Sequence, residues 1–253
     1  MTIMPNEAAF TSPSLVTPGL DDRPAFELKF SLDQDRAAQV EAWAHGRLLP
    51  DPHGDPDQGG SYSILSLYWD TPQLDVYHGS PGYRRHKYRV RRYGTLDLAF
   101  LERKSKWGDR VEKWRVAVPE DELDRLVEAD GAEGWPGHWF RRQVHGASLG
   151  PVCRIAYRRT AFVGTCPESP LRLTLDRHAF GVPAAGLSAG PGAAGRPLLG
   201  DKAILELKFR AGLPAPFKAL VAGLRLAPSR VSKYRLCQET WGVVRRPRGA
   251  ADA

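Results

Sequence analysis

The amino-acid sequence predicts an α+β fold, in which an antiparallel β-barrel carries helices on its outside. Between residues 61 and 209 most segments alternate apolar and polar residues with the period of two that is typical of β-strands. Few segments show helical spacing, and those that do are short. Each predicted strand also has one apolar and one strongly charged face, which favours a barrel whose apolar faces are covered by helices.

Length, charge and cysteine content restrict the function classes. The 253 residues suffice for one barrel-type domain or two small domains. The formal net charge of +7 indicates an anionic partner: a nucleic acid, a membrane surface or a phosphate-rich ligand. Three cysteines without a C-x-x-C pair predict reduced thiols in a cytoplasmic protein. No signal peptide and no apolar run of about 20 residues is evident, so direct membrane insertion is not expected.

The first predicted elements are a strand and a helix, which follow a tail at residues 1–23 that we expect to be disordered. Residues 26–30 alternate apolar and charged side chains, as strands do. Ser31 and Gln34 match an S-x-x-Q capping box, and the apolar residues behind it recur at helical spacing. Together they predict a strand that leads into a helix at residues 37–44.

From residue 61 onward the pattern predicts a run of strands with few interruptions. The expected strands cover residues 64–69, 88–93, 98–106, 111–118, 152–162, 171–179 and 204–209. Short helices are expected at 121–128 and 139–145, and a last amphipathic helix at 217–224. Residues 181–200 are mostly Gly, Ala and Pro, which predicts a long flexible loop. We expect the folded domain to span residues 24–242, with a second disordered tail at 243–253.

Alternate residues of a strand share a face, and this rule places charged residues together. Arg89 and Arg91 share one face of their strand, and Lys113 and Arg115 share a face of another. Lysines and arginines turned into a barrel are unfavourable without anionic guests or water. A wet, basic tunnel that binds a polyanion satisfies this requirement, and the sequence therefore predicts one.

Two other interpretations compete with the tunnel. Charged alternate residues can simply be the solvated face of an antiparallel sheet. Residues 84–93 combine basic side chains with aromatic ones, as nucleic-acid binders do. However, the basic residues are spread over the whole chain, and glutamates lie among them on the same faces. A carboxylate in a phosphate groove is unfavourable unless a metal bridges the two, so we expect no nucleic-acid partner.

The motifs, taken in order, resemble one known family. They are E-L-K-F, S-L-Y-W-D-T-P, K-Y-R-V-R-R-Y-G, F-L-E-R-K, Y-R-R-T-A-F, L-E-L-K-F and S-x-x-S-K-Y. Over residues 24–242 this order is similar to the catalytic domain of the vacuolar transporter chaperone (VTC) family, within the CYTH-like triphosphate tunnel metalloenzymes. The resemblance implies an eight-stranded antiparallel tunnel and a divalent metal, Mg or Mn. It also implies transfer of the γ-phosphate of ATP or another nucleoside triphosphate onto polyphosphate.

Positions within these motifs imply the site residues. The residues implied in catalysis are all cations: Arg89, Arg91, Lys104, Lys113, Arg159 and Lys233. The residues expected to bind phosphate are Lys29, Arg115, Tyr157, Arg230 and Ser232. Glu206 is implied as the metal ligand, which suits a Mg site of one or two carboxylates beside phosphate oxygens and waters.

The chain also departs from the family pattern. Many tunnel enzymes carry E-x-E-x-K on the first strand, but Ala25 takes the first of these positions, so only Glu27 and Lys29 remain. This departure argues against a two-metal site. Arg230 stands where lysine is familiar. The regulatory domain and membrane helices of eukaryotic relatives do not occur in this sequence, so export of a product would need a membrane-protein partner.

Three functions are open at this point. The first is polyphosphate synthesis from a nucleoside triphosphate, and the second is hydrolysis of tripolyphosphate or a nucleotide. The third is a non-catalytic module that binds polyphosphate or inositol phosphate. Neither a Walker loop nor a G-x-G-x-x-G fingerprint occurs, and no adenine pocket is evident, so the nucleotide is not specified.

Overall fold

The computed structural model describes residues 24–108, 110–128, 133–166, 169–184, 186–187 and 195–244. The two predicted tails lie outside the described residues, apart from residues 243–244. The predicted loop at 181–200 is only partly described: its first three residues continue a strand and residues 196–197 form a short one. The flexibility of the tails and of this loop therefore stays a prediction.

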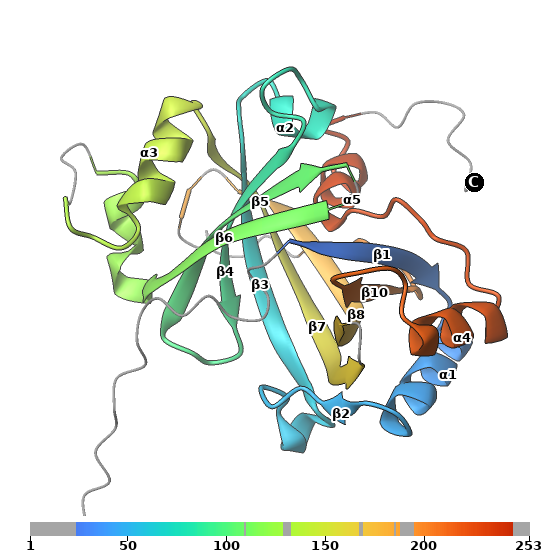
Figure 1. Ribbon diagram of the computed structural model, residues 1–253. Helices are drawn as coiled ribbons and strands as arrows, with labels where there is room; N and C mark the ends of the chain where they lie inside the picture. Colours follow the sequence, from blue (N-terminus) through green and yellow to red (C-terminus); the bar gives the residue numbers. More distant parts are fainter. Residues whose placement is uncertain are drawn as a thin grey trace, which may run out of the picture.

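Eight antiparallel strands form a closed ring (Figure 1). They are β1 (Ala25–Leu32), β3 (Ser61–Asp70), β4 (His86–Tyr93), β5 (Leu98–Trp107), β6 (Arg110–Pro119), β7 (Gly150–Cys166), β8 (Ser169–Pro183) and β10 (Ala203–Phe209). Their order is β7-β3-β4-β5-β6-β1-β10-β8, and the pairing of β8 with β7 closes the ring. The two-residue strands β2 (Leu49–Pro50) and β9 (Arg196–Pro197) pair with β7 and β8. The predicted eight-stranded antiparallel architecture is confirmed.

The ring is unevenly paired. β5 and β6 pair over ten positions, from Leu98 opposite Pro119 to Trp107 opposite Arg110. β1 pairs with β10 over seven positions but with β6 at only two, which involve Ala25 and Phe26. The first strand is therefore held in the ring mainly by β10, and its junction with β6 is the narrowest one.

Five helices and two 3-10 segments complete the described fold. They are α1 (Gln34–His45), α2 (Asp75–His78), α3 (His138–Gly146), α4 (Ala215–Gly223), α5 (Lys233–Thr240), η1 (Pro56–Gln58) and η2 (Glu120–Leu126). The helices predicted near 37–44, 139–145 and 217–224 are confirmed, whereas the one predicted at 121–128 is the 3-10 segment η2. None of the helices in the described ranges is both long and apolar enough to span a membrane.

Two details of these helices differ from the sequence-based expectation. The capping box predicted from Ser31 is wrong, because Ser31 is part of β1 and the cap of α1 is Asp33. The Asp33 carboxylate accepts the backbone N–H of Arg36 at 2.8 Å. The helix α5 follows the helix that was expected to be the last. Its sequence is largely polar, so it lacks the apolar periodicity that identifies a helix in sequence.

The apolar strand faces lie outside the ring, where helices cover them. One core packs α1 and α4 against β1, β8 and β10, and includes the fully buried side chains of Phe30 and Phe217. A second core packs α3 and η2 against β5 and β6, and includes Leu101 and Phe140. In Figure 1, α1 and α4 lie on one side of the ring and α3 on the other. The predicted outward orientation of these apolar faces is confirmed.

Buried Asp70 joins the end of β3 to α2 and α5. Its carboxylate accepts the backbone N–H groups of Thr71, Val76 and Tyr77 at 2.7, 2.8 and 2.9 Å. The hydroxyl of Tyr234, in the first turn of α5, donates to the same carboxylate. The ring of Tyr234 stacks on Tyr68 of β3, with 5.3 Å between the ring centroids. Asp70 therefore positions the start of α5 against the ring.

We expect Asp70→Ala to lower the free energy of unfolding by about 3 kcal/mol, because buried N–H groups lose a charged acceptor. Asp33→Ala is the matched control, since it removes only the exposed cap of α1 and should cost about 1 kcal/mol. Urea denaturation of both variants measures the difference. Equal losses of stability would contradict the role assigned to Asp70.

Candidate functional site

The inner faces of the described strands carry four carboxylates, each surrounded by cations. They are Glu27 on β1, Glu102 on β5, Asp176 on β8 and Glu206 on β10. Alternation puts them opposite the apolar side chains that pack beneath the helices. The cations around them form three groups, named after their carboxylates: the Glu102 cluster, the Glu27–Glu206 cluster and the Asp176 cluster.

In the Glu102 cluster one carboxylate lies among three guanidinium groups. Arg89 Nε donates to Glu102 at 2.5 Å, while Arg115 Nε and Arg91 Nη1 lie 3.5 and 3.9 Å from the carboxylate oxygens. The register explains this arrangement, because Glu102 is directly opposite Arg89 in β4 and Arg115 in β6. Burial alone would raise the pKa of Glu102, but Arg89 and Arg91 outweigh burial and hold this pKa well below its usual value.

The Glu27–Glu206 cluster has two carboxylates that converge on one ammonium group. Lys29 Nζ lies 2.9 Å from Glu206 Oε1 and 3.1 Å from Glu27 Oε1. Lys104 Nζ donates to the other oxygen of Glu27 at 2.7 Å. Burial would raise the pKa of Glu27, but Lys104 and Lys29 outweigh burial and lower the pKa to about 2. Burial is likewise outweighed at Glu206, whose pKa is held well below its usual value by Lys29 and Lys233.

The Asp176 cluster joins β7, β8 and α5. Arg159 donates to both oxygens of Asp176, from Nε at 2.6 Å and from Nη2 at 2.8 Å. Lys233, the first residue of α5, donates to the same carboxylate and lies 4.5 Å from the ring centroid of Tyr157. Arg159 Nη2 is also 3.8 Å from Glu206, which connects this cluster to the previous one. Residues of β7, β8, β10 and α5 thus meet around the carboxylates of Asp176 and Glu206.

Positive charge exceeds negative charge in these clusters, and several of the cations reach solvent. The side chains of Lys29, Lys104 and Arg115 are 28%, 25% and 24% exposed. Surplus positive charge in a partly buried site is favourable only with water or an anion beside it. Arginine forks bind phosphate oxygens in pairs, and lysines act as point charges. The interior can therefore hold an anion with several phosphate groups.

The remaining predicted residues differ in how closely they join the clusters. Lys113 is directly opposite Lys104, and its charge helps Arg89 and Arg91 to lower the pKa of Glu102 against the effect of burial. Ser232 occupies the N-cap position of α5 without a capping hydrogen bond from its side chain, and its hydroxyl accepts a hydrogen bond from Lys87 at 3.1 Å. Arg230 is exposed, and within the described ranges it makes no hydrogen bond or ion pair with the clusters. A phosphate-binding role for Arg230 stays a prediction.

Sequence reasoning does not single out Asp176 or Lys87. Asp176 shares the charged face of its strand with Arg172, but nothing in the sequence indicates that the cations of two distant segments meet there. Lys87 stands two residues before Arg89, so alternation alone could have placed it on the inner face. The inner face also carries aromatic side chains, since Tyr68 of β3 is directly opposite Arg89 and the ring of Tyr157 of β7 lies 4.5 Å from Lys233 Nζ.

The donor set fits a single hard divalent cation. Mg²⁺ and Mn²⁺ are bound by carboxylate, phosphate and water oxygens, and Mg²⁺ usually takes one or two carboxylates. Glu206 and Glu27 supply charged oxygens that already converge on the one cation Lys29. Among the described residues no group of three or more His, Cys, Asp or Glu could hold a metal by itself. A metal here would thus need substrate oxygens, and Glu206 and Glu27 would be its protein ligands.

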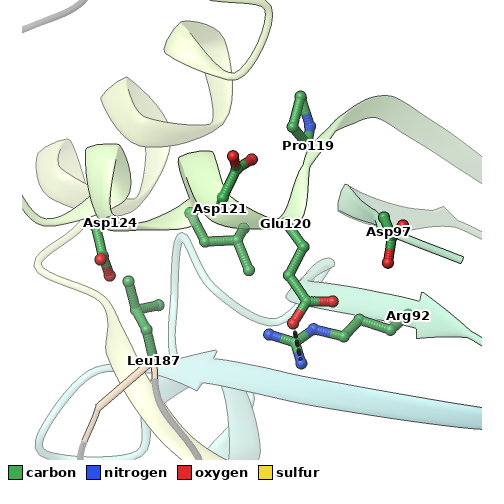
Figure 2. Close-up of a pocket in the computed structure, with 8 residues that line it drawn as sticks. Arg92, Asp97, Pro119, Glu120, Asp121, Asp124 and Leu187 are labelled. Carbon is green, nitrogen blue, oxygen red and sulfur yellow. Dashed lines mark ion pairs between the residues drawn. The ribbon is translucent and has the colours of Figure 1, made fainter. Parts of the chain in front are cut away.

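A surface cavity of about 640 Å³ lies outside the ring, between the β4–β5 turn and η2 (Figure 2). Asp97, Glu120, Asp121 and Asp124 line it, together with Arg92, which forms an ion pair with Glu120 at 2.6 Å. This cavity contains none of the predicted site residues. Its carboxylates would repel a polyphosphate, so the candidate site is the interior of the ring.

A closed antiparallel ring with a basic interior defines the triphosphate tunnel class of folds. HpAC1 from Hippeastrum, a proposed adenylyl cyclase with a dominant triphosphatase activity, is similar in fold. Its TM-score is 0.50 at 14% identity, and the match covers 85% of this chain and 96% of that chain. A proposed adenylate cyclase from Bacillus halodurans has a TM-score of 0.49 at 10% identity, covering 82% of this chain and 93% of that one. The PH1819 protein from Pyrococcus horikoshii has a TM-score of 0.49 at 13% identity, covering 85% and 99%.

The amino-acid sequence shows which family this chain belongs to. The VTC domain family matches residues 25–241, which is most of the chain. The chain therefore belongs to the VTC domain family, and the resemblance found in the motifs is confirmed. No curated protein sequence matches the chain. Because the sequence identities to these structures are only 10–14%, the structural similarity shows the fold alone.

We expect Glu102→Gln to lower the free energy of unfolding by about 3–5 kcal/mol, because it leaves buried guanidinium groups without a counter-charge. The matched control is Glu120→Gln, which breaks the half-exposed ion pair with Arg92 and should cost about 0–1 kcal/mol. Urea denaturation gives both values. If Glu102→Gln is no less stable than Glu120→Gln, Glu102 does not hold the arginine cluster together.

Proposed function

We propose that this VTC-domain chain transfers the γ-phosphate of ATP or another nucleoside triphosphate onto a growing polyphosphate, with Mg or Mn. The observation that carries the proposal is the surplus of cations over carboxylates inside a closed ring of strands. A linear polyphosphate carries negative charge along its whole length and suits such a ring, whereas a nucleic-acid duplex is too wide for it. The triphosphatase activity of the similar Hippeastrum protein supports chemistry on a triphosphate.

Phosphoryl transfer requires alignment and charge compensation, and little covalent chemistry from the protein. We assign the Glu102 cluster to phosphate binding, because Arg89, Arg91 and Arg115 can contact phosphate oxygens through paired N–H groups. Glu102 holds these arginines in place before the substrate arrives, so little reorganisation accompanies binding. Reduced reorganisation is the main contribution that a fixed set of charges makes to such a reaction.

The other two clusters are assigned to the transferred phosphate. Lys29 and Lys104 are held by Glu27, and Arg159 and Lys233 by Asp176. Their four charges approach the transferred group from two sides of the ring and offset the negative charge on its oxygens. A metal held by Glu206 and Glu27 would neutralise charge on the phosphates when bound.

Hydrolysis of tripolyphosphate or a nucleotide is the second candidate. The dominant triphosphatase activity of the Hippeastrum protein favours it. The two reactions differ in the acceptor, which is the terminal phosphate of a chain in one and water in the other. Ala25 removes one of the first-strand carboxylates that triphosphatases of this class carry, and this favours synthesis. The cytoplasmic location and a membrane-protein partner stay predictions.

Incubation of the purified chain with ATP and Mn²⁺ or Mg²⁺ tests the proposal. We expect polyphosphate chains on a gel and ADP in stoichiometric amount, because the γ-phosphate is transferred. Free phosphate without chains would favour hydrolysis instead. Neither product, together with tight binding of tripolyphosphate, would identify a binding module and contradict the enzymatic proposal.

Glu206→Gln should reduce turnover by about 10²–10³-fold, because the metal's stabilisation of transition-state charge is worth several kcal/mol. Affinity for tripolyphosphate without metal should persist or rise, since a negative charge has left the phosphate site. The control is Glu41→Gln, which breaks an ion pair with Arg177 outside the clusters. Turnover is measured against Mn²⁺ concentration for each variant. Near-normal turnover and metal dependence in Glu206→Gln would remove Glu206 from the proposed site.

A further inference from the structure

Lys87 differs from Lys29, Lys104 and Lys233 in having no acidic partner among the described residues. Lys29, Lys104 and Lys233 each form an ion pair with a carboxylate. The Lys87 ammonium donates to the Ser232 hydroxyl at 3.1 Å, and no carboxylate in the described part of the chain forms an ion pair with it. Lys87 is only partly exposed, so water does not fully replace the missing counter-charge. The Lys87 ammonium therefore gains a counter-charge only when an anion binds beside it.

The charges that act most strongly on Lys87 are those of cations. Lys29 on β1 and Lys104 on β5 approach it from the ring, Arg235 approaches from α5, and Arg89 lies on its own strand. Burial together with these charges lowers the pKa of Lys87 to about 7. Lys87 therefore loses its proton far more readily than an ordinary lysine does when no ligand is bound.

The position of Lys87 indicates what would bind there. Ser232 is the cap residue of α5, but its side chain makes no capping hydrogen bond, so the hydroxyl is available to a ligand and to Lys87. Lys87 is directly opposite Lys104, which belongs to the Glu27–Glu206 cluster. A phosphate between Lys87, Lys104 and Ser232 would therefore extend the proposed site toward α5.

We propose that Lys87 is a phosphate-binding residue of this site, and that it takes up a proton from solvent when the polyanion binds. The inference rests on the proposed function, because it requires a phosphate ligand inside the ring. The phosphate supplies the counter-charge that the protein lacks, and the protonated amine then donates to a phosphate oxygen. The proton comes from water or from a buffer acid, so an N–H bond forms on the amine and an O–H bond breaks in the proton donor, while no P–O bond changes.

The coupling has a defined pH dependence. Below pH 7 the free protein already holds the proton, so ligand binding leaves Lys87 unchanged. Above pH 7 the free amine is neutral and each binding event takes up a proton. The contribution of Lys87 to affinity therefore falls by about tenfold per pH unit above 7, by linkage between proton and ligand binding.

Calorimetric titration with tripolyphosphate, without metal, tests the inference at pH 6 and pH 8 in buffers of different ionisation enthalpy. Lys87→Arg keeps the positive charge but cannot titrate in this range, so titration of the ligand's own phosphates cancels between it and the wild type. The wild type should take up more protons per ligand than Lys87→Arg, and this difference should be larger at pH 8 than at pH 6. Lys87→Met should bind about tenfold more weakly at pH 6, whereas the exposed-site control Lys218→Met should bind as the wild type does.

The outcomes separate this inference from the proposed function. If the wild type binds tripolyphosphate tightly but shows the same proton uptake as Lys87→Arg, the inference is overturned and the phosphate site stands. If Lys87→Met and Lys218→Met bind equally well, Lys87 is not a phosphate ligand. If neither the wild type nor Lys218→Met binds tripolyphosphate, the proposed function fails and the inference fails with it. Thermal denaturation of each variant establishes that it is folded.

Discussion

Charge turned toward the inside of a strand ring is the constraint on which the rest of this structure depends. Lysines and arginines can occupy the inner faces because Glu27, Glu102, Asp176 and Glu206 hold them in ion pairs. Once the charged faces point inward, the alternation of a strand turns the apolar faces outward. These faces require cover, and α1, α3 and α4 supply it. The peripheral helices are in this sense a consequence of the polar interior, whereas a small filled barrel has the opposite alternation.

The carboxylates keep the cations in fixed positions while leaving positive charge in excess. A buried ion pair often contributes little net stability, because desolvation offsets the attraction between its charges. Its value here is geometric: Arg159 is held at both oxygens of Asp176, and Arg89 is held by Glu102 from the neighbouring strand. Such an arrangement binds an anion without first paying for side-chain ordering. Glu27 and Glu206 are also the carboxylates that would hold the proposed divalent cation, so in this proposal the structural and metal-binding roles fall on the same residues.

The helix α5 connects the fold to the site at one end of the ring. Asp70 holds Tyr234 at the end of β3, and the neighbouring Lys233 consequently meets Asp176. Ser232 meets Lys87 at the same place. The helix α5 and its N-cap residue therefore contribute two polar groups to the interior, and their position depends on Asp70, which lies outside the three clusters. The side chains that Lys233 and Ser232 add to the proposed phosphate site therefore depend on the stability of the turn between β3 and α2.

The sequence by itself determined the strands, the charged face of each and the family, because side-chain alternation and motif order are local properties of the chain. The inner-face position of most candidate cations could be predicted in the same way, since Arg89, Arg91 and Lys104 follow the period of two. Only the tertiary structure decided which charges meet. Lys29 and Glu206 are 177 positions apart, and their contact depends on the register between β1 and β10. The partners of Lys87 and Lys233 likewise depend on where α5 packs, because closure of the ring brings together segments that no local pattern relates.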